Sequence, residues 1–87
     1  MPRFVQFSEA ERIAPAASAF EIAPDDEAGL PQPARAVYVG LGGDLKVVTL
    51  DGETVTFRSV PGGSLLPVQV RKVFAAGTTA GALVGLR

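Results

Sequence analysis

The sequence predicts an all-β protein, a small five-stranded antiparallel barrel or sandwich that follows an extended, proline-rich N-terminal arm. Three observations support this fold class. The 87 residues allow one domain at most, prolines crowd the first part of the chain, and short apolar segments separated by turn residues fill the second part. We therefore divide the chain into an arm and linker, residues 1–34, and a β domain, residues 35–87.

The arm is expected to have no regular element longer than about two or three turns, because prolines interrupt it. Ser8 and Glu11 have the spacing of a capping box, which favours one short helix that Pro15 ends. A second turn is expected over residues 16–20. Residues 23–33, APDDEAGLPQP, combine acids, prolines and turn formers, and they predict a linker.

The β domain contains one strong hairpin signal, the stretch VVTLDGETVTF. Two alternating apolar and polar runs flank Asp51 and Gly52, and a two-residue Asp-Gly loop is typical of a type I′ turn. This turn places Val48 opposite Val55 and predicts that their side of the hairpin is buried. The other side, which carries Val47, is expected to be half exposed.

The succession of strands and turns is that of a meander. Residues 40–43 supply a glycine turn, and Pro61 with Gly62 favours a type II turn with a positive φ at Gly62. Pro67 cannot donate a ladder hydrogen bond, so the fourth strand is expected to start there at an edge or a bulge. The five expected strands span residues 36–39, 44–50, 53–60, 65–75 and 82–86.

The composition argues against an enzyme, a metal centre and a cofactor site. The chain has no histidine and no cysteine, which removes the commonest general base, metal ligand and reactive thiol. No spacing nominates a base for Ser64, Thr78 or Thr79, and a role as turn hydroxyls explains them better. The acids at 25–27 fit a solvated linker better than a calcium loop, which needs about six or more ligands. Residues 40–44, GLGGD, precede a hairpin rather than a helix and so indicate a turn, not a nucleotide-binding loop.

Charge is divided between the two parts of the chain. Acids outnumber bases before residue 35 and bases outnumber acids from there on, although the formal net charge is only −1. Two copies can therefore attract each other end to end, and nucleic acid is not expected as the main partner. The alternative function is a free-standing small barrel that binds nucleic acid or carbohydrate through a face with Arg58, Arg71 and Lys72. With no apolar run of about 20 residues and no signal peptide, the chain is expected in the cytosol without a membrane partner.

Apolar residues are expected on both faces of the short strands, and Leu45, Val47 and Val73 are among them. One covered face does not bury them all, and a domain of this size has few other means of doing so. The residues thus predict a homo-oligomer with Leu45, Val47 and Val73 at the subunit contact.

Several motifs follow one another in residues 35–87: RAVYVG, GGDL, DGETVTF, VPGGSLLPVQV and GTTA, with APDD and LP ahead of them in residues 23–31. On these motifs the chain resembles the head spike base protein family of phage-like gene transfer agents and related prophages. It departs from that family in its first 20 residues and in one glycine of VPGG, where alanine is expected.

The resemblance implies a structural protein without catalytic activity. It implies a homo-oligomer of five copies that forms a ring at a fivefold vertex of a capsid. The ring would be held by the major capsid protein and would carry a spike fibre protein that attaches to cell-surface polysaccharide. The implied location is the surface of a virus-like particle that is assembled in the bacterial cytoplasm and released by lysis.

The arm is the part that we expect to contact the capsid. Its apolar residues cannot be buried within a regular element of their own, and arginines flank them, as in a tether that orders on binding. The alternative is that these residues cover the exposed sheet face of their own subunit or of a neighbour. The residues concerned are Arg3, Phe4, Val5, Phe7 and Arg12.

Overall fold

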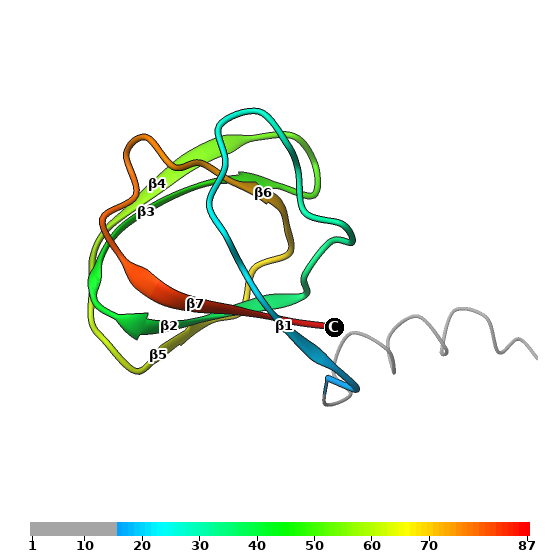
Figure 1. The fold of residues 1–87 in the computed structure, drawn as a ribbon, viewed down its shortest axis with the longest axis horizontal. Coiled ribbons are helices and arrows are strands. Elements are labelled where there is room, and N and C mark those ends of the chain that lie inside the picture. The colour runs from blue at the N-terminus through cyan, green and yellow to red at the C-terminus, as the bar shows by residue number, and fades with distance from the viewer. Residues whose placement is uncertain (1–15) are drawn as a thin grey trace, which may run out of the picture.

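The computed structural model describes residues 16–87, which form two antiparallel sheets and contain no helix (Figure 1). The predicted all-β class is confirmed, although the described residues form seven strands rather than five. The helix expected before Pro15 lies outside the described residues. The strands are β1 (Ala19–Glu21), β2 (Ala36–Leu41), β3 (Gly43–Thr49), β4 (Thr54–Val60), β5 (Ser64–Leu66), β6 (Val70–Val73) and β7 (Gly81–Leu86).

The strand order is not that of the expected meander. The first sheet has the order β1-β7-β2-β5 and the second the order β4-β3-β6, so only β3 and β4 form a hairpin of consecutive strands. A single residue, Gly42, separates β2 from β3, and here the chain turns from one sheet into the other. A Cβ at Gly42 would lie 2.7 Å from the carbonyl oxygen of Val60, so this corner has no room for a side chain.

Pro67 divides the expected strand at 65–75 into two strands that lie at the edges of different sheets. β5 ends at Leu66 and β6 begins at Val70, and the amide of Val68 donates to the carbonyl of Leu66 at 2.9 Å. The expectation of an edge position next to Pro67 is met, because a proline without an N–H is tolerated where pairing stops. The chain uses this break to cross from the first sheet to the second.

The sequence predicts a positive φ at Gly62 in the turn before β5, but in the structure the positive φ is at Gly63. Gly63 has a φ of 85°, and its amide donates to the carbonyl of Val39 at 2.7 Å. Gly62 instead packs closely on β2, since a Cβ there would lie 3.0 Å from the carbonyl oxygen of Gly40. Glycine is therefore favoured at both positions, at Gly63 because of its positive φ and at Gly62 because a side chain would crowd the backbone of β2.

The β3–β4 hairpin has a three-residue loop instead of the predicted two-residue loop. The amide of Thr49 donates to the carbonyl of Glu53 at 2.8 Å, and the amide of Gly52 donates to the carbonyl of Thr49 at 2.9 Å. Gly52 has a φ of 98°, as in a type I turn followed by a bulge glycine. The register is therefore shifted by one residue, so that Val47 pairs with Val55, and Val47 faces the core.

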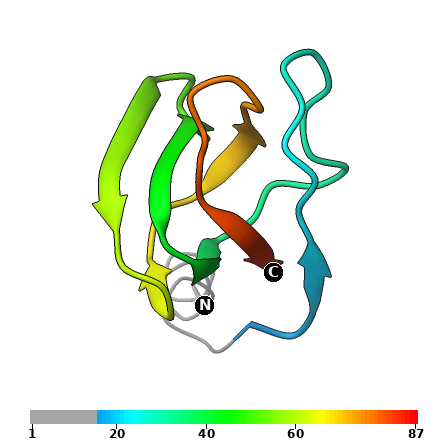
Figure 2. The same cartoon turned by 60° about the vertical axis from the view of Figure 1, so that its left-hand side comes forward.

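One core lies between the two sheets (Figures 1 and 2). Alternate residues of each strand point into it, as expected where one face of a sheet is buried. Each fully buried valine or leucine contributes on the order of 1.5–3 kcal/mol relative to an exposed one. The largest fully buried side chains of the described residues are Val37, Val39, Leu45, Val47, Val70 and Val73.

The segment that precedes β2 is packed on the sheets along much of its length. The expected turn at residues 16–20 is wrong, because Ala19–Glu21 forms β1 and pairs with β7. Beyond β1, the amide of Ile22 donates to Leu83 of the first sheet, and the amide of Ala34 donates to Val70 of the second, both at 2.9 Å. The segment thus covers the edge of β6 and joins the two sheets on one side.

Candidate interaction surfaces

The three residues predicted at a subunit contact lie in the core of the single chain. Leu45 and Val47 are fully buried, and Val73 is 2% exposed. The register shift of the hairpin turns Leu45 and Val47 inward, where they pack with Val73 between the sheets. This corrects the expectation from the sequence, since none of the three side chains is accessible to a neighbouring subunit. The five residues predicted at the capsid contact, Arg3, Phe4, Val5, Phe7 and Arg12, lie outside the described residues.

The outer face of the first sheet carries an exposed row of side chains that crosses all four strands. Glu21 pairs with Val84, Val84 with Tyr38, and Tyr38 with Leu65, so the four side chains share one face. Tyr38 is 41% exposed and Leu65 is 53% exposed. We call Val84, Tyr38 and Leu65 the apolar row.

The neighbours of the apolar row on this face are small or apolar. A Cβ at Gly40 would lie 2.8 Å from the Cβ of Ala82 and 3.6 Å from Cε2 of Tyr38, so the Tyr38 ring lies along the strand over Gly40. Ala82 itself has a φ of 52°, which is uncommon for alanine. Cross-strand pairing adds Ala19, Leu86 and Ala36 to the same face. Glu21 is therefore the one charged residue among the described strand residues of this face.

A second apolar patch lies at the end of the β3–β4 hairpin. Leu50 in the loop is 44% exposed and Val55 at the start of β4 is 37% exposed. Arg71 of β6 reaches the hairpin loop, since its Nη2 lies 3.3 Å from the position of a Cβ on Gly52. We call Leu50, Val55 and Arg71 the hairpin-end patch.

The outer face of the second sheet is polar and basic. The ammonium groups of Lys46 and Lys72 lie 4.9 Å and 4.6 Å from the centre of the Phe74 ring, within the range of cation–π attraction. Lys72 Nζ also donates to the carbonyl of Asp26 at 2.7 Å. The basic residues of the alternative phosphate-binding face have separate neighbours. Arg58 pairs with Asp44 at 3.5 Å, and Arg71 reaches the loop at Gly52.

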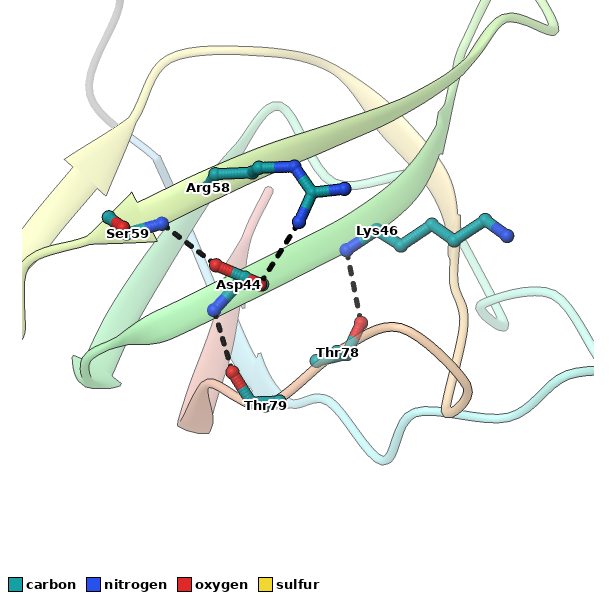
Figure 3. A network of polar contacts seen from close by, with 6 residues as sticks. All are labelled: Asp44, Lys46, Arg58, Ser59, Thr78 and Thr79. Carbon is teal, nitrogen blue, oxygen red and sulfur yellow. Dashed lines mark hydrogen bonds and ion pairs between the residues drawn. The ribbon is translucent and has the colours of Figure 1, made fainter.

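The loop between β6 and β7 is fastened to β3 by its threonines (Figure 3). The hydroxyl of Thr78 accepts from the amide of Lys46 at 3.0 Å, and that of Thr79 accepts from the amide of Asp44 at 2.8 Å. Asp44 returns two bonds, because its carbonyl accepts from the amides of Thr79 and Ala80. The two threonine hydroxyls thus have structural roles as acceptors of backbone hydrogen bonds.

Asp25 and Asp26 hold backbone groups rather than standing free in a linker. The amides of Glu27 and Ala28 donate to Oδ1 of Asp25 at 2.8 Å and 3.1 Å and hold the pKa of this carboxyl below its ordinary value of 3.8, an effect to which Lys72 adds. Asp26 Oδ1 accepts from the amides of residues 75 and 76. Among residues 16–87 no group of three or more acidic side chains could hold a metal ion.

A shallow groove of about 280 Å³ lies beside β1 and is lined by Phe20, Glu21, Pro31, Gln32 and Arg87. The guanidinium of Arg87 lies 5.3 Å from the Phe20 ring centre and donates to Oε1 of Gln32. Within residues 16–87, Arg87 Nε is buried without a hydrogen-bond partner. The groove offers cation–π and amide contacts but no pair of groups for proton transfer, so its chemistry is that of a contact surface.

The described surface consists of an apolar sheet face, a hairpin end and a basic sheet face. No helix among residues 16–87 is long and apolar enough to cross a membrane. Asp44, which organises the loop before β7, was missed by sequence reasoning, because an aspartate after two glycines gives no signal beyond that of a turn.

No protein-family model matches the chain, and no curated protein matches it either. A match was found among solved structures. It is a chain in a structure described as the capsid of a native GTA particle computed with C5 symmetry. That chain is 41% identical over 84% of this chain and 84% of its own length, and the two folds superpose with a TM-score of 0.76.

Proposed function

This chain belongs to the family of that GTA capsid-particle protein, and from this membership we propose that it is the head spike base of a phage-like particle. Its relative is part of a capsid structure, which supports a structural, particle-associated role. In the proposal, five copies form a ring at a fivefold vertex of the capsid. The ring carries a spike fibre protein that attaches the particle to a cell surface.

The observation that carries the proposal is the capsid relative whose structure was computed with C5 symmetry. Fivefold symmetry is the symmetry of a capsid vertex, and a ring of five small barrels fits it. The described fold supports the same role. Short strands joined by tight turns give a rigid body that suits such a ring.

We place the capsid contact in the first part of the arm, at Arg3, Phe4, Val5, Phe7 and Arg12. The supporting argument is composition, since apolar residues flanked by arginines and interrupted by proline favour a tether that orders on its partner. The loops that connect strands at the opposite side of the ring are then free for the fibre.

Native mass spectrometry of the purified chain tests the ring, and the expected mass is that of five copies. A monomer at micromolar concentration would contradict it. Deletion of residues 1–12 tests the arm, and we expect an unchanged ring mass and β circular dichroism but no incorporation into particles. If the shortened chain falls apart into monomers, the arm belongs to the subunit contact. The salt dependence of binding distinguishes the ring from a nucleic-acid-binding barrel. Phosphate binding weakens steeply as the salt concentration rises, whereas the association of apolar surfaces does not.

A further inference from the structure

We propose that the ring closes when the apolar row of one copy packs on the hairpin-end patch of the next copy. The inference rests on the proposed function, because it assumes a ring of identical chains. It names the two surfaces that meet: Val84, Tyr38 and Leu65 on one side, and Leu50, Val55 and Arg71 on the other.

A ring with fivefold symmetry requires two different surfaces on every subunit. A twofold contact uses the same patch on both partners and ends at a dimer, so repeated contacts around a ring must be head to tail. The two surfaces must also leave each other accessible within one subunit. The apolar row lies on the outer face of the first sheet and the hairpin-end patch at the end of the second, so both conditions are met.

Most of the exposed large apolar side chains of residues 16–87 lie in these two surfaces. Tyr38 and Leu65 are cross-strand partners, Leu50 and Val55 both lie near the end of the β3–β4 hairpin, and Leu41 lies at the corner between β2 and β3. Apolar residues that are clustered rather than scattered on a small domain mark contact sites. The outer face of the second sheet, with its lysines, is less suited to packing without water.

Each of the two surfaces has a charged residue beside it, and the two charges are of opposite sign. The apolar row ends in Glu21, the one charged residue among the described strand residues of its face, and the hairpin-end patch includes Arg71. Asp51 and Glu53 near the hairpin loop are negatively charged, so the contact must bring Glu21 to Arg71 and away from these two acids. Such a head-to-tail contact gives Glu21 a partner of opposite charge.

Cysteine cross-linking tests the contact directly, because the chain has no cysteine of its own. We expect the double variant Leu65→Cys with Leu50→Cys to form, on oxidation, a ladder of covalent oligomers up to five chains on a non-reducing gel. Each single variant is expected to stay uncross-linked. The matched control combines Leu50→Cys with Leu41→Cys, which places an equally exposed thiol outside the apolar row and should give no ladder.

The outcomes separate the inference from the proposed function. A wild-type monomer in native mass spectrometry would overturn both. A wild-type ring whose double variant gives no ladder would overturn only the inference, as would covalent dimers from Leu65→Cys alone, which would show a twofold contact. If circular dichroism shows that the Leu65 variant does not fold, Tyr38→Cys with Val55→Cys tests the same contact. The single variants Glu21→Arg and Arg71→Glu should each weaken the ring, and the double variant, in which the two charges are exchanged, should restore it.

Discussion

The carboxylate of Asp44 holds the backbone of Ser59 in a left-handed conformation. Oδ1 of Asp44 accepts from the Ser59 amide at 2.9 Å, and Ser59 has a φ of 56°, which few residues other than glycine adopt (Figure 3). The same aspartate binds the loop before β7 through its backbone. Asp44, at a bulge of β3, therefore joins the end of β4 through its side chain to the entry of β7 through its backbone.

Replacement of Asp44 by alanine is expected to lower the free energy of unfolding by about 1–3 kcal/mol, because the Ser59 amide loses a charged acceptor. Ser59→Gly alone should be neutral or stabilising by about 1 kcal/mol, since glycine tolerates this conformation. In the Ser59→Gly background the cost of Asp44→Ala should be smaller. Urea unfolding of the four proteins gives the coupling, and fully additive effects would show that Asp44 does not support this conformation.

Comparison of Gly43→Ala with Gly63→Ala separates two causes of lost stability, a steric clash of the new Cβ and strain of the backbone. Both glycines have positive φ, 156° and 85°, but a Cβ at Gly43 would lie 2.6 Å from Thr79 Oγ1, whereas nothing lies within 4 Å of one at Gly63. Gly63→Ala should cost about 1 kcal/mol of stability from strain alone. Gly43→Ala should cost more, because the loop before β7 must also move, and equal losses in thermal unfolding would contradict the close contact.

Leu45→Ala is expected to destabilise the folded chain by about 2–5 kcal/mol, as for other fully buried leucines. The measurement is chemical denaturation followed by circular dichroism. The exposed Leu41 is the control, and Leu41→Ala should change the unfolding free energy by less than about 0.5 kcal/mol. If Leu45→Ala instead leaves the unfolding transition unchanged and only dissociates the ring, the residue belongs to a subunit contact after all.

Asp25 should contribute a pH-dependent part of the stability at acid pH. Because the backbone amides of Glu27 and Ala28 lower its pKa in the folded chain, the contribution is complete above the ordinary value of 3.8 and is lost as the pH falls through the depressed folded pKa. NMR titration of the Asp25 carboxyl carbon measures this pKa. Asp25→Asn keeps an acceptor oxygen and should retain the turn without the pH dependence. A midpoint at or above 3.8 would refute the prediction.

The sequence predicted the strands of the β domain better than their pairing. The Asp51-Gly52 signal located the hairpin, but a glycine at this place serves a two-residue and a three-residue loop equally well. The predicted two-residue loop placed Val47 on the exposed face of the hairpin, and for this reason Val47 was predicted at a subunit contact. Register is decided by which face the other sheet covers, and that information is not local.

The exposed surfaces could not be predicted because they depend on strands that come from distant parts of the sequence. The apolar row combines residues of β2, β5 and β7, and their alignment follows from pairings that skip over the hairpin. β1 was also hidden, since three residues among prolines give no periodic signal. The break at Pro67, by contrast, was predictable, because proline lacks the N–H that a continuous strand needs.

The pairing of β1 with β7 has a consequence for the order in which the protein folds. Ala19 and Leu86, from opposite ends of the described chain, are partners, so the first sheet cannot be completed on the ribosome until β7 has been synthesised. The β3–β4 hairpin needs only neighbouring residues and can form within about 1–10 μs. Non-local pairing of the kind that closes the first sheet is characteristic of domains that fold in milliseconds to seconds. The β3–β4 hairpin can therefore form before the first sheet, whose completion must wait for β7.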